Sequence, residues 1–108
     1  MKFQLRIKDE AQTNILRNAV WWSDHHSHLK AEEWIYAVYQ QIDDLVSMPE
    51  RHGLARENVE FPFDLRQKLV GLGPRPSYRV LFRIVGNYVE VLTFLAAEED
   101  DWTAEVFP

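Results

Sequence analysis

Basic side chains are concentrated in one part of the sequence. Residues 51–83 carry seven Arg and Lys against three Asp and Glu, a local charge of +4, although the whole chain has a net charge of -5. Arginine and lysine bind carboxylates and phosphates, so this segment could bind an anionic group. Arg66 and Lys68 alternate onto one face of an expected strand, where they could share an anion with Arg79. The simpler interpretation of Arg66 and Lys68 is that they are solvated surface residues.

Three histidines, His25, His26 and His28, stand close to Asp24 and Glu32. These residue types bind metal ions, and His28 and Glu32 are one helical turn apart, but the spacing is permissive rather than specific. Histidines at a turn between helices are more often solvated polar residues. We therefore expect no metal site and no cofactor.

Composition excludes several classes of protein. The 108-residue length fits one domain, here 1–108 with an acidic tail over about 96–108, and the absence of cysteine excludes disulfides and thiolate metal sites. The sequence has no phosphate-binding glycine loop, nucleophile elbow or apolar run long enough to span a membrane. We expect a cytoplasmic protein, and the overall negative charge argues against non-specific binding to nucleic acid.

The first half of the chain has the pattern of a strand followed by two helices. Residues 3–7 alternate apolar and polar side chains, which is typical of a half-buried strand. Apolar residues then recur at helical spacing from Asp9, an expected N-cap, to about Ser23, and again from Ser27, a second expected N-cap, to Pro49. The short connection predicts an antiparallel pair of helices.

The second half has the pattern of a sheet. After an irregular segment at 50–62, the sequence predicts strands at 63–70, 78–85 and 88–95. Gly86 and Asn87 separate the last two strands and are typical of a tight two-residue hairpin turn. The predicted order of strand, two helices and three strands gives an α+β fold.

The hairpin turn also fixes an expected register. A two-residue turn pairs Val85 with Tyr88 across the hairpin. Counting back, Phe82 pairs with Val91, Val80 with Thr93 and Tyr78 with Leu95, and these pairs form an apolar side of the sheet suited to pack on the helices. The other face then pairs Arg79 with Phe94, Leu81 with Leu92 and Arg83 with Glu90. With no helix left to cover it, we expect this open face to bind a partner, or to be covered by the chain's own tail through Trp102 and Phe107.

Several segments resemble the RelE/ParE toxins of bacterial type II toxin-antitoxin systems, and in particular the ParE-like plasmid stabilisation branch. The similar segments are Trp21-Trp22, Pro49-Glu50-Arg51, residues 54–58, FPFDLRQKL at 61–69 and YRVLFRIVGNYVEVL at 78–92. The resemblance implies a β-α-α-β-β-β fold with a two-helix hairpin packed on one face of a mainly antiparallel sheet. It also implies a toxin that a cognate antitoxin neutralises and that acts on a target such as DNA gyrase.

One departure from the family concerns the end of the last strand. Relatives usually continue into a basic run containing Arg and His, whereas this chain has Leu95 and Ala96 followed by acidic residues. A ribosome-dependent mRNA endonuclease of the RelE kind needs cations and a group that moves a proton. The resemblance offers as catalytic candidates Arg79, Arg66, Lys68 and Tyr78.

Three functions therefore stay open: a toxin that binds its target, an mRNA endonuclease, and a degenerate member that binds an antitoxin without being toxic. In all three an antitoxin binds the chain. We expect its binding residues on the open sheet face and on the outer surface of the helical hairpin. They are Arg79, Leu81, Leu92, Phe94, Arg66 and Trp21.

Overall fold

The computed structural model describes residues 3–99 and 101–103. Its elements follow the predicted order: β1 (Gln4–Ile7), α1 (Asp9–His25), α2 (His28–Asp43), β2 (Arg66–Val70), β3 (Tyr78–Val85) and β4 (Tyr88–Ala96). The strands form one sheet in the order β1-β4-β3-β2, in which β1 is parallel to β4 and the other neighbours are antiparallel. The predicted α+β fold is confirmed.

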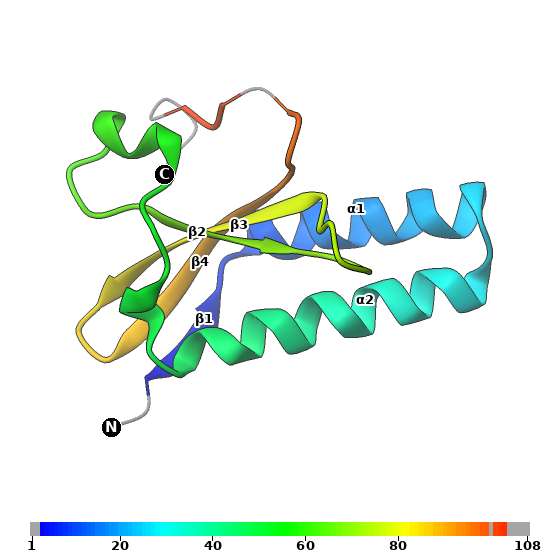
Figure 1. The fold of residues 1–108 in the computed structure, drawn as a ribbon, viewed down its shortest axis with the longest axis horizontal. Coiled ribbons are helices and arrows are strands. Elements are labelled where there is room, and N and C mark those ends of the chain that lie inside the picture. The colour runs from blue at the N-terminus through cyan, green and yellow to red at the C-terminus, as the bar shows by residue number, and fades with distance from the viewer. Residues whose placement is uncertain (1–2, 100, 104–108) are drawn as a thin grey trace.

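The two helices form the predicted hairpin and run side by side (Figure 1). The Ser27 hydroxyl accepts a hydrogen bond from the Lys30 amide at 3.0 Å, so this predicted N-cap is confirmed. The prediction for α1 is wrong: Lys8 is its N-cap and makes no side-chain cap. Asp9 instead lies in the first turn, where its charge is favourable next to the helix N-terminus.

The helices cover one face of the sheet, called here the helix face. Ala11 and Ile15 of α1 and Trp34 and Val38 of α2 are buried against β3 and β4. Trp34 is fully buried, with its ring centroid 5.1 Å from that of Tyr78. Burial of a large apolar side chain such as Ile15 or Val38 contributes about 1.5–3 kcal/mol, so this layer is the main apolar core.

A β-bulge changes the register of the β3–β4 hairpin. The predicted pairs hold from Val85–Tyr88 to Phe82–Val91, but an irregularity between Leu81 and Phe82 shifts every pair beyond it. Leu81 faces Thr93, Val80 faces Phe94, Arg79 faces Leu95 and Tyr78 faces Ala96. The predicted pairs Arg79–Phe94, Leu81–Leu92, Val80–Thr93 and Tyr78–Leu95 are therefore wrong, because the alternation of side chains is interrupted by one extra residue in β4.

The bulge moves Phe94 to the helix face. Its ring lies 5.8 Å from Trp34 and stacks on Tyr78 at 5.2 Å. The prediction that Phe94 lies on an open face is wrong, because the residues after the bulge alternate in the opposite sense.

The opposite side of the sheet, called here the second face, is covered by irregular chain that contributes Ala55, Phe61, Phe63 and Leu65. Short 3-10 helices at Pro49–Arg51 and Arg56–Glu60 precede β2. Strand β2 begins at Arg66 rather than at the predicted residue 63, because Leu65 bonds back to the loop. Its amide donates to the Asn58 side chain at 2.7 Å, and its carbonyl accepts from the Ala55 amide at 2.8 Å.

Leu81 and Leu92 of the second face are therefore buried, together with Leu65, Leu95 and Trp102. The prediction of an open face is wrong. The alternative, cover by the chain's own tail, is confirmed for Trp102, whereas Phe107 lies outside the described residues.

Candidate functional site

Arg79, the first predicted site residue, is an internal ion-pair residue. Its guanidinium donates to both carboxylate oxygens of Glu57, at 2.9 and 2.6 Å, and to the Gln67 side chain at 3.0 Å. Arg79 and Glu57 are almost completely buried. A paired and buried guanidinium is held by its partner, so Arg79 does not offer a surface cation to a ligand.

Glu57 is a residue that the sequence analysis did not single out. Burial raises the pKa of Glu57, but hydrogen bonds from Arg79 and from the Trp102 amide outweigh it and lower that pKa to about 2. Its carboxylate therefore stays charged at neutral pH. Its direct neighbours Arg56 and Asn58 are polar, so nothing local marks Glu57 as a buried residue, and only its position in the 54–58 segment could have drawn attention to it.

Arg66 and Lys68 also bind backbone oxygens of the chain itself. Arg66 Nη1 donates to the carbonyls of Glu50 at 3.2 Å and His52 at 2.6 Å. Lys68 Nζ donates to the carbonyl of Gln41 near the end of α2 at 2.7 Å. The two side chains therefore tie β2 to the loop and to the helix, whereas Arg79 lies elsewhere, in its pair with Glu57.

Tyr78 is likewise part of the packing. Its hydroxyl accepts a hydrogen bond from the Trp22 indole at 3.1 Å, and the residue is almost fully buried. The predicted pairing of Arg83 with Glu90 is confirmed, with a distance of 2.7 Å between Nε and Oε1. The four catalytic candidates are therefore not gathered around one open site.

His52 is a second residue that the sequence analysis missed. Burial, followed by the charges of Lys68, Arg51 and Arg66, lowers the pKa of its imidazole. The ring is partly exposed and lies 5.8 Å from that of Phe82. The sequence signal was its place in the basic segment: a neutral imidazole among cations can accept a proton next to a bound anion.

The histidines at the tip of the helical hairpin pack against tryptophans. His25 stacks on Trp21 with a centroid distance of 4.4 Å, and His26 stacks on Trp22 at 4.6 Å. The Ser23 hydroxyl and His28 Nδ1 are 2.6 Å apart and join the ends of the two helices. Among residues 3–99 and 101–103, acidic and histidine side chains form no group that could hold a metal ion.

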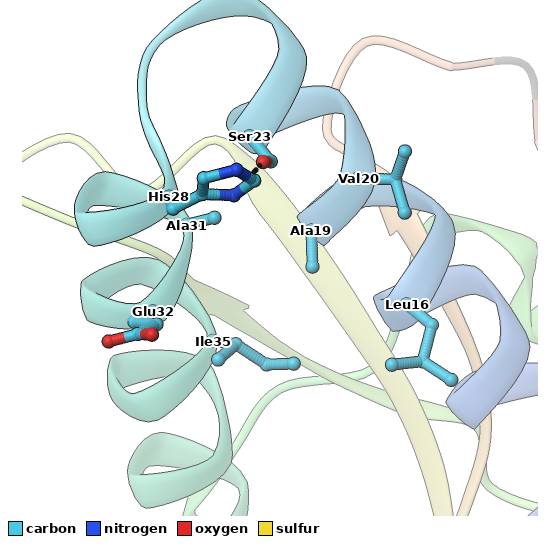
Figure 2. Close-up of a pocket in the computed structure, with 8 residues that line it drawn as sticks. All are labelled: Leu16, Ala19, Val20, Ser23, His28, Ala31, Glu32 and Ile35. Atoms are coloured by element: carbon cyan, nitrogen blue, oxygen red, sulfur yellow. Dashed lines mark hydrogen bonds between the residues drawn. The ribbon is translucent and has the colours of Figure 1, made fainter.

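A groove of about 540 Å³ lies between α1 and α2 and is called here the hairpin groove. Figure 2 shows that side chains from both helices line it, with strands of the sheet behind them. Most of the side chains that line it are apolar: Leu16, Ala19, Val20, Ala31 and Ile35. The polar lining residues are Ser23, His28 and Glu32.

Two apolar residues make the hairpin groove accessible. Leu16 and Val20 are 57% and 59% exposed, although they lie one turn apart on a regular helix. The nearby Trp21 is 45% exposed, as the predicted role on the outer hairpin surface requires. Contiguous exposed apolar side chains are typical of a site for a protein partner, so this groove is the candidate functional site. Leu16 and Val20 had a readable signal, since they fall beside the apolar stripe that faces the sheet.

Comparison with solved structures confirms the resemblance at the level of the fold. A chain of the "Chromosomal ParDE TA system from P. aeruginosa" matches with a TM-score of 0.74 and 18% identity, over 90% of this chain and 98% of that one. A mutant of the E. coli toxin RelE in the free state matches with a TM-score of 0.55 and 15% identity, over 91% and 86%. The chain has the RelE/ParE fold.

Comparisons by sequence add nothing to this fold assignment. No protein-family model matches the chain, and no curated protein matches it. Within the described residues no helix has the length and apolar character needed to cross a membrane.

Proposed function

We propose that this chain is the toxin of a type II toxin-antitoxin pair, of the ParE-like plasmid stabilisation kind, and that its antitoxin binds the hairpin groove. The fold shared with a ParDE system and with RelE supports the class of protein. The observation that carries the binding site is the groove itself, with exposed Leu16 and Val20 on a regular helix. Both proteins of such a pair are cytoplasmic.

The sheet is a poorer site for the antitoxin than the sequence suggested. Leu81, Leu92 and Phe94 are buried in the free chain, and Arg79 is paired with Glu57. An antitoxin that used them would first have to displace packed chain. Trp21 does not line the groove but is exposed, so it keeps its proposed role on the outer hairpin surface, whereas Arg66 is mostly buried and engaged with the loop.

The groove also indicates the chemistry of the antitoxin segment. Its apolar floor is open along the two helices, so an amphipathic helix with leucines at spacings of three and four residues fits it. The central apolar contacts should supply most of the binding free energy, as in other protein interfaces.

The basic side chains favour a toxin that acts by binding its target rather than by cutting RNA. The target that the resemblance implies is DNA gyrase. Arg79, Arg66 and Lys68 each donate to an acceptor in the chain itself, and the Tyr78 hydroxyl accepts from Trp22. These groups would have to exchange partners before they could stabilise a reacting phosphate.

His52 favours a second candidate, the mRNA endonuclease. The imidazole is partly buried beside Lys68, Arg51 and Arg66, and burial followed by these three charges lowers its pKa. It would supply the proton-accepting group that the last strand lacks. We expect His52→Ala to abolish any codon-site cutting of ribosome-bound mRNA, whereas Arg75→Ala on an exposed loop should leave cutting unchanged.

Induced expression tests the proposal as a whole. Growth should stop when the chain is expressed alone and recover when the product of the adjacent reading frame is co-expressed. A purified gyrase assay should then show blocked supercoiling or accumulated double-strand breaks, without RNA products. Unimpaired growth would contradict both toxic functions and favour a degenerate member that binds an antitoxin only.

A further inference from the structure

The tail that follows β4 places one aromatic side chain, Trp102, in the apolar cluster of the second face. Trp102 is 5% exposed and stacks on Phe61, with ring centroids 5.2 Å apart and an angle of 11°. It packs with Leu65, Leu81 and Leu92 in the apolar cluster of that face. The tail therefore occupies a site that the rest of the chain forms.

Both the backbone amide and the indole N–H of Trp102 donate a hydrogen bond. Its amide donates to Glu57 Oε2 at 3.0 Å, and its indole N–H donates to Glu10 Oε2 of α1 at 3.0 Å. Glu57 is the same carboxylate that binds Arg79. The site therefore recognises both an indole and a backbone N–H, with acceptors that the globular part supplies.

The residues before Trp102 add charge complementarity. Arg56 forms an ion pair with Asp101 and donates to the Glu99 carbonyl at 3.2 Å. Asp101 of the acidic tail therefore pairs with Arg56 of the basic segment 51–83.

The described tail, residues 97–99 and 101–103, belongs to no strand. Its backbone is held by single bonds such as that from the Ala97 amide to the Ser77 carbonyl at 2.7 Å, rather than by a ladder. Segments with few backbone bonds open at lower free energy than the sheet that they cover. We therefore expect the tail to open at a lower free energy than the pairing of β3 with β4.

We propose that the second face is a binding site for an acidic peptide centred on tryptophan, and that the free chain fills it in cis with its own tail. A partner segment of the same chemistry binds there only by displacing the tail. The tail thus acts as a built-in competitor. This site is separate from the hairpin groove and does not depend on the toxin function.

Hydrogen exchange of the unmodified chain tests whether the tail opens by itself. The Trp102 amide should exchange at least about 10-fold faster than the amides of Val80 and Val91, and its rate should depend only weakly on denaturant. Equal protection with the same denaturant dependence would overturn the proposal, because the tail would then leave only on global unfolding.

Binding in trans tests whether the face recognises the tail. The probe is a fluorescein-labelled peptide of this chain's residues 97–103, and fluorescence anisotropy reports its binding. The full-length Trp102→Ala variant should bind it at least about 10-fold more tightly than the wild type, whose own tail competes. The same peptide with alanine in place of tryptophan should not bind.

A matched variant controls for the loss of an aromatic side chain. Tyr36→Ala, at an exposed position of α2, keeps the tail in place and should bind the peptide no better than the wild type. Equal binding to wild type and Trp102→Ala, or binding to neither, would overturn the proposal. If Trp102→Ala does not fold, hydrogen exchange of the wild type decides the question alone.

Discussion

The two faces of the sheet are both buried, but by different means. On the helix face, two regular helices bring apolar side chains such as Ile15 and Trp34 against the strands. On the second face, an irregular loop and the tail close over a smaller apolar cluster and the Glu57–Arg79 pair. The helix face therefore depends mainly on apolar packing, whereas the second face combines apolar packing with a buried ion pair.

This difference decides where a partner can bind without rearrangement. The helices use one side for the core and leave their outer side free, so the hairpin groove is open in the folded chain. The sheet has no such free side, because the loop and the tail take the place that a third helix would have. Of the two surfaces that the sequence offered to a partner, the sheet face is closed, whereas the outer surface of the helical hairpin is accessible.

The largest expected effect is at the helix face. Trp34→Ala removes a fully buried indole between helix and sheet and should cost about 3–5 kcal/mol of unfolding free energy, because regular elements cannot collapse into the cavity. Trp102→Ala should cost less than half as much, since the tail can leave by itself. Urea unfolding of both variants measures the two losses of unfolding free energy. Equal losses would mean that the tail contributes as much to stability as the helix face and does not open by itself.

The buried ion pair should come next. Glu57→Gln leaves the Arg79 guanidinium buried without its counter-charge and should cost about 3 kcal/mol. The control is Glu33→Gln, which breaks an exposed pair with Lys30 and should cost less than about 0.5 kcal/mol. Similar small losses in both variants would show that the second face does not depend on its ion pair.

Acid should weaken the second face through the same carboxylate. The pKa of Glu57 is about 2 in the folded chain against 4.5 for an ordinary glutamate, so its stabilisation is complete above about pH 4.5 and is lost as pH falls toward 2. Between pH 6 and pH 3 this group alone should remove about 2 kcal/mol.

Chemical denaturation at several pH values measures this loss, and Glu57→Gln should show a correspondingly shallower decline. An identical decline in the variant would assign the acid sensitivity to other groups.

The sequence predicted the helix face well because its elements are periodic. Helical spacing from Ala11 to Trp22, the Ser27 cap and the Gly86-Asn87 turn are local signals, and each has its expected place. The second face depends instead on contacts between distant residues, such as Glu57 with Arg79 and Trp102, which no local period encodes.

The errors at the site have the same origin. The bulge adds one residue to β4, and that single residue turned Phe94 toward the helices and placed Arg79 opposite Leu95. The cations of residues 51–83 were identified by type, but type does not tell whether an arginine faces solvent or a carboxylate. Trp21 could be placed on the outer hairpin surface because helical geometry alone fixes that position.

The central claim is that the antitoxin binds the hairpin groove, and a calorimetric titration with the purified product of the adjacent reading frame tests it most directly. Val20→Asp puts a charge into the apolar groove at an exposed position, so it should keep the fold and weaken binding by more than about 2 kcal/mol, or about 30-fold in Kd. The matched control, Val59→Asp at an exposed position of the 3-10 helix Arg56–Glu60, should bind like the wild type. Equal affinities of Val20→Asp and wild type would contradict the account and place the antitoxin elsewhere on the chain.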